Sequence, residues 1–191
     1  GVGVKGLFLS EEGFRHFFAT KPLSGTADFE NIKLRVTADP IMRGVAESLK
    51  ANPVSVGFGD LYVALQTGVV DAAEQPIANY LANHFHNVAP YMILDGHTLG
   101  VTEVVISSES WDSLTKNQQD ILLEAGKYAG EVCRKFSQDA EDAAKKQLSD
   151  EGAVFTEVKD LTPWQNASAK IIEESAKADP ALYKQILELA K

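Results

Sequence analysis

The sequence predicts an α/β fold in which helices connect the strands of a sheet. Strand-like runs at 32–36 and 53–58 are separated by a helical segment that starts at Asp39-Pro40. This alternation is typical of strands joined by crossover helices. A second observation is one very long helical pattern, from Thr115 to Leu148. Neither an internal repeat nor a low-complexity linker is present in the sequence.

Composition and charge narrow the class of protein. The 191 residues suit one domain or a tightly joined pair, and an apolar content of 45% predicts a sizeable core. The 27 acidic residues outnumber the 18 basic ones, giving a formal charge of −9. Nucleic-acid binding needs a dense basic face, so no nucleic-acid partner is expected. The single cysteine excludes an internal disulfide framework, and no apolar run is long enough to cross a membrane.

The first segment is expected to be extended but interrupted. Residues 2–9 alternate as in a strand, residues 10–13 resemble a turn, and the aromatic run 14–18 is extended again. Arg15 lies inside this aromatic run. An arginine among apolar neighbours either extends to the surface or contacts an anion, and the residues alone leave both roles open.

The next unit is predicted as strand, helix, strand. In the strand at 32–36, Ile32, Leu34 and Val36 share one face, and Lys33 and Arg35 share the other. Asp39 is expected to cap the following helix, with Pro40 at its first position. The buried stripe of that helix is predicted to consist of Ile41, Val45 and Leu49, with Met42 and Ala46 beside them.

The stretch 57–80 is expected to be a short helix, a short strand and a polar turn. Asp60 is a suitable N-cap, and Gly68 a suitable C-terminal stop. Val69-Val70 then form a brief extended run that leads to Asp71, Glu74 and Gln75 in a turn closed by Pro76.

A parallel sheet would bring several of these residues to one edge. Arg35, Phe58 and the turn at Glu74-Gln75 all lie near the carboxyl ends of predicted strands, and in a parallel sheet these ends meet at the same edge. A cation, an aromatic face and amide groups would suit an anionic ligand. A helix–strand unit with a solvated acidic turn remains the alternative.

The remaining elements are mainly helical. Residues 77–85 form a helix, 88–97 lead back to the sheet, and 104–106 and 153–158 are strands. The long helix, about 50 Å at 1.5 Å per residue, begins with a capping box of Thr115 and Gln118. Its apolar stripe is predicted as Ile121, Ala125, Ala129, Val132, Phe136, Ala140 and Ala143. Further helices open at Thr162-Pro163, with Thr162 as the cap, and at Asp179-Pro180.

Groups with catalytic or metal-binding chemistry are few. His84 and His86 would point to different sides of a helix, so a zinc site with His97 is not expected. Cys133 is interpreted as a small core residue. Asp71 and Glu74 form a possible acid pair, for which a structural role is preferred. The sequence contains no Gly-rich phosphate loop and no G-x-S-x-G elbow. We therefore expect no catalytic residue, no metal and no cofactor, and no enzyme activity.

The chain resembles the second half of the solute-binding proteins of tripartite ATP-independent periplasmic (TRAP) transporters. The resemblance covers essentially the whole chain and is most specific in its central block. The segments that carry it, in matching order and spacing, are Gly13-Phe14-Arg15, Ile32-Lys33-Leu34-Arg35-Val36, the block from Phe58 to Asp71, Glu74-Gln75-Pro76, Ile106-Ser107 and Trp111.

The resemblance implies a receptor that captures an organic acid, such as a dicarboxylate or a sugar acid, between two lobes. The fold would be part of a two-lobe, class II periplasmic-binding-protein fold, a mixed sheet flanked by helices with one long lobe-spanning helix. Arg35 would pair with the ligand carboxylate through two parallel bonds, Arg15 would give a second contact, and Phe58 would pack on the ligand. Gln75 stands where asparagine is common, and it reaches one methylene further.

The resemblance also implies partners and location. A TRAP membrane permease would receive the ligand in the periplasm, after signal-peptide removal. Such receptors are longer, so we expect this chain to be a fragment without most of the first lobe. The implied division is a second-lobe core at 1–100, a crossover strand and long helix at 101–148, and packing elements at 149–191. Two alternatives stay open: a hydrolase or isomerase using Asp71 and Glu74, and an interaction protein using the long helix.

Overall fold

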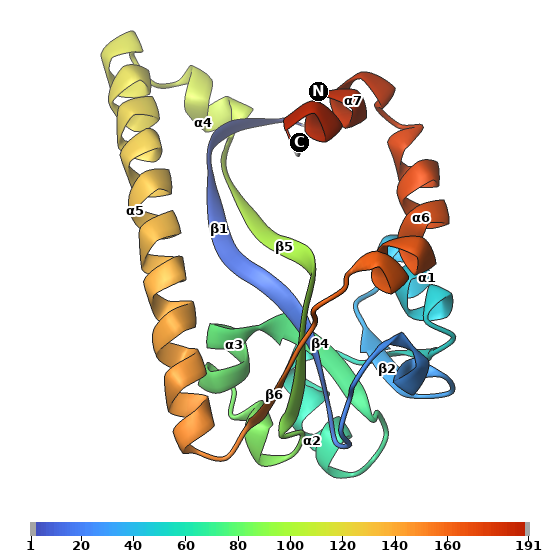
Figure 1. Ribbon diagram of the computed structural model, residues 1–191. Coiled ribbons are helices and arrows are strands. Elements are labelled where there is room, and N and C mark those ends of the chain that lie inside the picture. Colours follow the sequence, from blue (N-terminus) through green and yellow to red (C-terminus); the bar gives the residue numbers. More distant parts are fainter. Residues whose placement is uncertain (1–2, 190–191) are drawn as a thin grey trace. The chain divides into compact units, whose positions relative to one another are not determined.

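The computed structural model describes residues 3–189 and has the predicted alternation of strands and helices (Figure 1). The strands are β1 Val4–Ala19, β2 Lys33–Val36, β3 Asn52–Ser55, β4 Ala72–Pro76, β5 Tyr91–Ser107 and β6 Val154–Glu157. The α-helices are α1 Pro40–Ser48, α2 Leu61–Gln66, α3 Ile77–Ala82, α4 Ser108–Asp112, α5 Lys116–Asp150, α6 Thr162–Ala176 and α7 Pro180–Leu189. Short 3-10 helices are η1 Thr26–Phe29, η2 Phe58–Asp60 and η3 Phe85–Asn87.

The strands form one mixed sheet with the order β3-β2-β4-β1-β5-β6. Strand β2 pairs in parallel with β3, with Arg35 opposite Val54, and in parallel with β4, with Leu34 opposite Ala72. The predicted crossover arrangement is therefore confirmed for β2, β3 and β4. Strand β6 pairs in parallel with the first part of β5, where Tyr91 lies opposite Val154.

The chain divides into two compact units, each discontinuous in sequence. Unit 1 contains residues 1–16, 75–83 and 96–152, and unit 2 contains residues 17–74, 84–95 and 153–191. Strands β1, β4 and β5 contribute residues to both units, whereas α5 belongs entirely to unit 1. No helix among residues 3–189 combines the length and the apolar character that a membrane span requires.

Three aromatic rings form the centre of unit 2. The ring of Phe29 meets the ring of Phe17 edge-on at 4.9 Å between centroids and that of Trp164 at 5.5 Å, while Phe17 and Trp164 stack at 6.0 Å. Phe17 comes from β1, Phe29 from η1 and Trp164 from the start of α6, so the cluster joins segments far apart in sequence. Such aromatic contacts add to the stability that burial alone provides.

Helix α1 begins as predicted but buries a narrower face. The Asp39 carboxylate accepts the N–H of Ile41 at 2.7 Å, with Pro40 in the first turn. Ala46 and Leu49 are buried, whereas the Ile41 side chain is 50% exposed. The prediction for Ile41 was wrong: this residue lies in the first turn, whereas the buried residues Ala46 and Leu49 lie toward the other end of the helix.

Two predicted caps differ from the prediction in different ways. Asp60 occupies the N-cap position of α2 as predicted but makes no side-chain cap bond, and 3-10 helix η2 ends there and leads into α2. At α6 the carboxylate of Asp160, not Thr162, acts as the acceptor, and it takes the Thr162 N–H at 2.9 Å. The predicted start of a helix at Asp179-Pro180 is confirmed, since α7 begins at Pro180 and Asp179 accepts the N–H of Leu182 at 2.9 Å.

Strand β1 is continuous, so the turn predicted at residues 10–13 is absent. Gly13 supplies a buried position with φ +100° inside the strand, which allows the chain to bend without leaving the sheet. The short strand predicted at 104–106 is likewise the end of the longer strand β5. At residues 10–13, the polar residues that suggested a turn are accommodated within the strand.

Helix α5 has the predicted start but buries a different face. Thr115 and Gln118 form the expected capping box. The predicted apolar stripe is largely exposed, with Ile121 at 55%, Val132 at 47% and Phe136 at 73%. The helix buries instead Gly126, Ala144 and Leu148.

Glycine explains why this face was mispredicted. A Cβ atom added at Gly126 would lie 3.2 Å from the Leu7 carbonyl oxygen, and one added at Gly130 would lie 3.2 Å from the Leu9 carbonyl oxygen. The missing side chains let α5 lie directly against the backbone of β1. Hydrophobic periodicity does not register such a face, since glycine carries no apolar side chain.

Candidate functional site

Arg35 is the penultimate residue of strand β2 and is held in a defined orientation. Its side chain is only 4% exposed, and its Nε donates a hydrogen bond to the Val56 carbonyl oxygen at 3.0 Å. Leu34 and Val36 are also buried, so β2 is covered on both faces, as is typical of parallel strands. The bond to Val56 fixes the plane of the guanidinium, whose two terminal nitrogens form the fork that matches a carboxylate.

Phe58 lies two residues beyond Val56 and presents an exposed aromatic face. It begins η2, just after β3, and 47% of its surface is exposed. Its ring meets the ring of Phe85 edge-on at 6.0 Å, and Phe85 in turn stacks on Phe18 at 5.5 Å. A buried aromatic pair therefore supports an aromatic side chain that is open to solvent. Unit 2 thus contains an oriented cation and an exposed ring at the carboxyl ends of the adjacent parallel strands β2 and β3.

Glu74 and Gln75 lie within a buried strand, which corrects the predicted polar turn. Strand β4 runs from Ala72 to Pro76, and Glu74 and Gln75 are only 1% and 4% exposed.

The predicted stop of helix α2 at Gly68 is confirmed, with φ +73° and a hydrogen bond from the Gly68 N–H to the Leu65 carbonyl oxygen at 3.2 Å.

The extended run predicted at Val69-Val70 instead forms the connection into β4. Val69 is 52% exposed, and Val70 is buried outside any strand. Pairing with β2 begins only at Asp71, whose N–H donates to the Lys33 carbonyl oxygen at 2.8 Å. The prediction failed because this valine pair matches a strand in composition, whereas the bonds of β2 decide where β4 starts.

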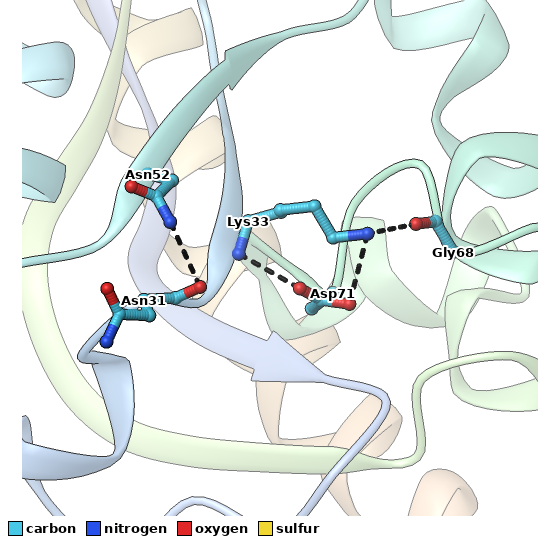
Figure 2. A network of polar contacts seen from close by, with 5 residues as sticks. All are labelled: Asn31, Lys33, Asn52, Gly68 and Asp71. Carbon is cyan, nitrogen blue, oxygen red and sulfur yellow. Dashed lines mark hydrogen bonds and ion pairs between the residues drawn. The ribbon is translucent and has the colours of Figure 1, made fainter.

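Asp71 belongs to a polar network at the start of β2 (Figure 2). Its carboxylate accepts the Lys33 backbone N–H at 3.0 Å and lies 3.7 Å from the Lys33 ammonium, which also donates to the Gly68 carbonyl oxygen. Beside this network, the Asn52 side chain donates to the Asn31 carbonyl oxygen at 3.1 Å. Asp71 thus joins the start of β2 to the loop before β4.

This placement does not favour Asp71 and Glu74 as an acid pair. The two residues are three positions apart along an extended segment, which separates their Cα atoms by roughly 10 Å. Asp71 is engaged with Lys33, and Glu74 is buried near the other end of β4. The geometry assigns Asp71 a structural role, which is the role preferred from the sequence.

Arg15 and Gln75 belong to unit 1, whereas Arg35 and Phe58 belong to unit 2. Arg15 is partly buried in β1, two residues after Gly13. Gln75 is buried near the end of β4, directly before Pro76. Each of the four residues predicted to bind ligand therefore occupies a strand or follows one, and their joint contact with a ligand stays a prediction.

Glu141 is a partly buried residue near the candidate site that sequence reasoning missed. Its two carboxylate oxygens accept backbone N–H groups from the start of α3, that of Ile77 at 3.0 Å and that of Ala78 at 2.7 Å. Burial raises the pKa of the Glu141 carboxyl, the two N–H bonds act in the opposite direction, and neighbouring Asp142 raises it further. One signal was available: Glu141 precedes Ala144 and Leu148 by three and seven positions, on the face that α5 buries.

The histidines form no metal centre in the part of the chain that the structure describes. His84 and His86 have ring centroids 6.0 Å apart, and His84 is exposed with φ +55°. Among residues 3–189 no group of three or more histidine, cysteine or acidic side chains is arranged to hold a metal ion. Cys133 is a free, partly buried thiol on α5.

Comparison with known proteins points to a single family. The family model described as bacterial extracellular solute-binding protein, family 7, matches residues 1–179. The C4-dicarboxylate-binding periplasmic protein DctP of Rhodobacter capsulatus is 26% identical over 166 residues, which are 87% of this chain and 49% of that protein.

Two solved structures have the same fold over nearly the whole chain. A TRAP periplasmic solute-binding protein from Sulfitobacter sp. NAS-14.1, with bound β-D-galacturonate, matches at a TM-score of 0.87 and 30% identity, covering 95% of this chain and 61% of that one. One from Pseudomonas putida F1, with bound D-glucuronate, matches at 0.91 and 27% identity, covering 96% and 60%. The chain spans about half the length of the Rhodobacter protein.

Proposed function

We propose that this chain, which belongs to bacterial extracellular solute-binding protein family 7, supplies the acid-binding residues of a TRAP-transporter receptor. The similarity to this family expected from the sequence is confirmed by the match over residues 1–179. The ligand is a small organic acid, and the receptor delivers it to a membrane permease on the outer side of the cytoplasmic membrane. Binding and delivery involve no catalysis.

The observation that carries this proposal is the burial and fixed orientation of the Arg35 side chain. A buried guanidinium, oriented by Val56 at the carboxyl end of a parallel strand, is suited to an anion at that edge. Phe58 follows the neighbouring strand with an exposed ring that can pack against the apolar side of a ligand. In the receptor, Arg15 gives the acid a second cation, and Gln75 gives it an amide.

Sugar acids and dicarboxylates are the ligands to test first. The two solved relatives hold galacturonate and glucuronate, and the Rhodobacter relative is named for C4-dicarboxylates. All three compounds present a carboxylate, which Arg35 would hold. They differ in the body of the molecule, where Phe58 and Gln75 would decide between them.

The longest natural protein that contains this chain provides the direct test. We expect isothermal titration to detect binding of D-galacturonate, D-glucuronate or succinate. Arg35→Ala should weaken that binding roughly 100-fold, because the ligand carboxylate would be left without its partner. Arg35→Lys should weaken it less, since it keeps the charge and loses the fork.

A matched control comes from the same unit. Arg43 on α1 is a half-exposed arginine whose guanidinium lies 3.9 Å from Glu47. Arg43→Ala should leave the dissociation constant unchanged, and circular dichroism should show that all variants are folded. Acid binding that persists in a folded Arg35→Ala variant would contradict the proposal.

The alternatives from the sequence are less well supported. A hydrolase or isomerase would need Asp71 and Glu74 to act together, but Asp71 is paired with Lys33. An interaction protein would display the apolar stripe of α5, and that stripe is indeed exposed. We favour the receptor because the family match includes the whole of α5, so the helix is part of the receptor fold.

A further inference from the structure

The carboxylate of Glu141 on α5 is bonded to the start of a helix distant in sequence. Oxygen Oε2 accepts the N–H of Ile77 at 3.0 Å, and Oε1 accepts that of Ala78 at 2.7 Å. These are the first two residues of α3. The residue before them, Pro76, has no side-chain group to cap the helix, so Glu141 satisfies N–H groups that a local cap would normally serve.

The two hydrogen bonds of Glu141 lie directly beside Gln75, a residue of the proposed acid site. Gln75 precedes Pro76, so only the proline separates it from the two N–H groups that Glu141 holds. Pro76 fixes its own φ at −61°, which leaves little backbone freedom between the bonded amides and Gln75. The position of Gln75 therefore depends on the position of Ile77 and Ala78.

The same carboxylate also lies against strand β1. A Cβ atom added at Gly13 would lie 2.9 Å from Glu141 Cδ, closer than real Cβ atoms approach a neighbour. Gly13 has φ +100°, a conformation that glycine adopts without strain. Arg15 follows two residues later on the same strand. One side chain of α5 thus touches the two backbone segments that carry Arg15 and Gln75, all within unit 1.

We propose that Glu141 is a positioning residue of the acid site, whose carboxylate holds the backbone next to Gln75 and Arg15 in the binding geometry. This inference rests on the proposed function, in which these two residues contact the ligand. Glu141 itself does not contact the acid, because a carboxylate would repel it and both of its oxygens are bonded to N–H groups. It acts through the backbone.

The environment of Glu141 acts on its charge in two directions. Burial raises the pKa of the Glu141 carboxyl, whereas the bonds from the N–H groups of Ala78 and Ile77 lower it. The ionised carboxylate is therefore opposed by its partial burial and supported by the two amides that it holds.

The test compares Glu141→Gln with Glu131→Gln in the longest natural protein that contains this chain. Glu131 is an exposed glutamate on the same helix, so it controls for the loss of a charge from α5. With D-galacturonate and succinate as probes, we expect Glu141→Gln to raise the dissociation constant roughly tenfold. Glu131→Gln should leave the dissociation constant unchanged.

Two further measurements separate positioning from a general structural role. In a double-mutant cycle, Glu141→Gln and Gln75→Ala should be non-additive in binding free energy, because Glu141 acts through Gln75. Hydrogen exchange of the Ile77 and Ala78 amides should be faster in Glu141→Gln. If that variant does not fold, Gly13→Ala places a methyl group against the same carboxylate and should also weaken binding.

The outcomes distinguish this inference from the proposed function. If the unmodified protein binds no acid, or if Arg35→Ala binds as well as the unmodified protein, the proposed function fails. If Arg35→Ala loses binding but folded Glu141→Gln or Gly13→Ala binds normally, or if the double-mutant cycle is additive, only the positioning role fails.

Discussion

Arg35 is a buried charged residue and Glu141 a partly buried one, and the two have different partners. Arg35 is 4% exposed at the end of β2, and alternation alone would place it with Lys33 on the more polar face of the strand. The structure buries it because helices cover a parallel sheet on both sides. The Arg35 guanidinium donates to the Val56 carbonyl oxygen, and we propose that it also binds the ligand carboxylate. The Glu141 carboxylate accepts N–H groups from the backbone of α3.

The stability of the protein should depend on pH through Glu141. Because burial raises its pKa above the ordinary value of 4.5, the folded protein binds this proton more tightly than the unfolded chain. The resulting stabilisation is present below the unfolded pKa and is lost as the pH rises through the folded pKa. We therefore expect the free energy of unfolding of the unmodified protein to fall relative to that of Glu141→Gln between about pH 4 and pH 7.

Urea denaturation of both proteins across this pH range measures the difference directly. The control is Glu131→Gln, which removes an exposed glutamate from the same helix. Parallel pH profiles for Glu141→Gln and the unmodified protein would mean that Glu141 titrates at its ordinary pKa.

At the scale of single elements, local signals predicted the ends of helices better than the faces they bury. The capping box of α5 depends on Thr115 and Gln118, which are three residues apart, so the sequence contains all the information. The buried face of α5 depends on where the backbone of β1 lies, which no local pattern records. The exposed Phe136 and the buried Gly126 are therefore the reverse of what hydrophobicity predicts.

In the candidate site, too, some features could be predicted from the local sequence and others could not. The place of Arg35 at the end of a parallel strand could be predicted, since it follows from alternation and from the crossover order of β2 and β3. Glu141 could not, because its partners Ile77 and Ala78 are more than sixty residues away in sequence. The burial of Gln75 was also missed, because β4 begins later than the valine pair suggested.

The close packing of α5 on β1 should make Gly126 intolerant of larger side chains. Gly126→Val places atoms within 3.2 Å of the Leu7 carbonyl oxygen and of the Phe8 ring, so we expect a loss of about 1–3 kcal/mol in the free energy of unfolding. Ala125→Val introduces the same residue one position earlier, on the exposed side, and should cost less than about 1 kcal/mol. Urea denaturation measures both, and equal losses would show that helix propensity rather than contact with β1 decides.

At the scale of the whole molecule, the length of the chain relative to its family determines how binding should be tested. The chain spans 49% of the Rhodobacter relative and 60–61% of the two solved structures, while those structures cover nearly all of it. The fold of residues 3–189 is therefore a part of a larger family architecture. A ligand held from one side only remains in contact with water, and the attraction between Arg35 and a carboxylate is weak in water. We infer that strong binding needs enclosure by segments that the longer relatives possess.

This inference predicts weak or undetectable acid binding by the 191-residue chain alone. Isothermal titration with D-galacturonate and succinate should give a much larger dissociation constant for this chain than for the longest natural protein that contains it. Because Arg35 is buried and oriented within unit 2, the difference should arise from the missing enclosure and not from loss of the arginine geometry. A cooperative thermal transition of the isolated chain establishes that it is folded during the titration. Equal affinities for the two proteins would show that these residues form a complete site, and the role of enclosure would have to be abandoned.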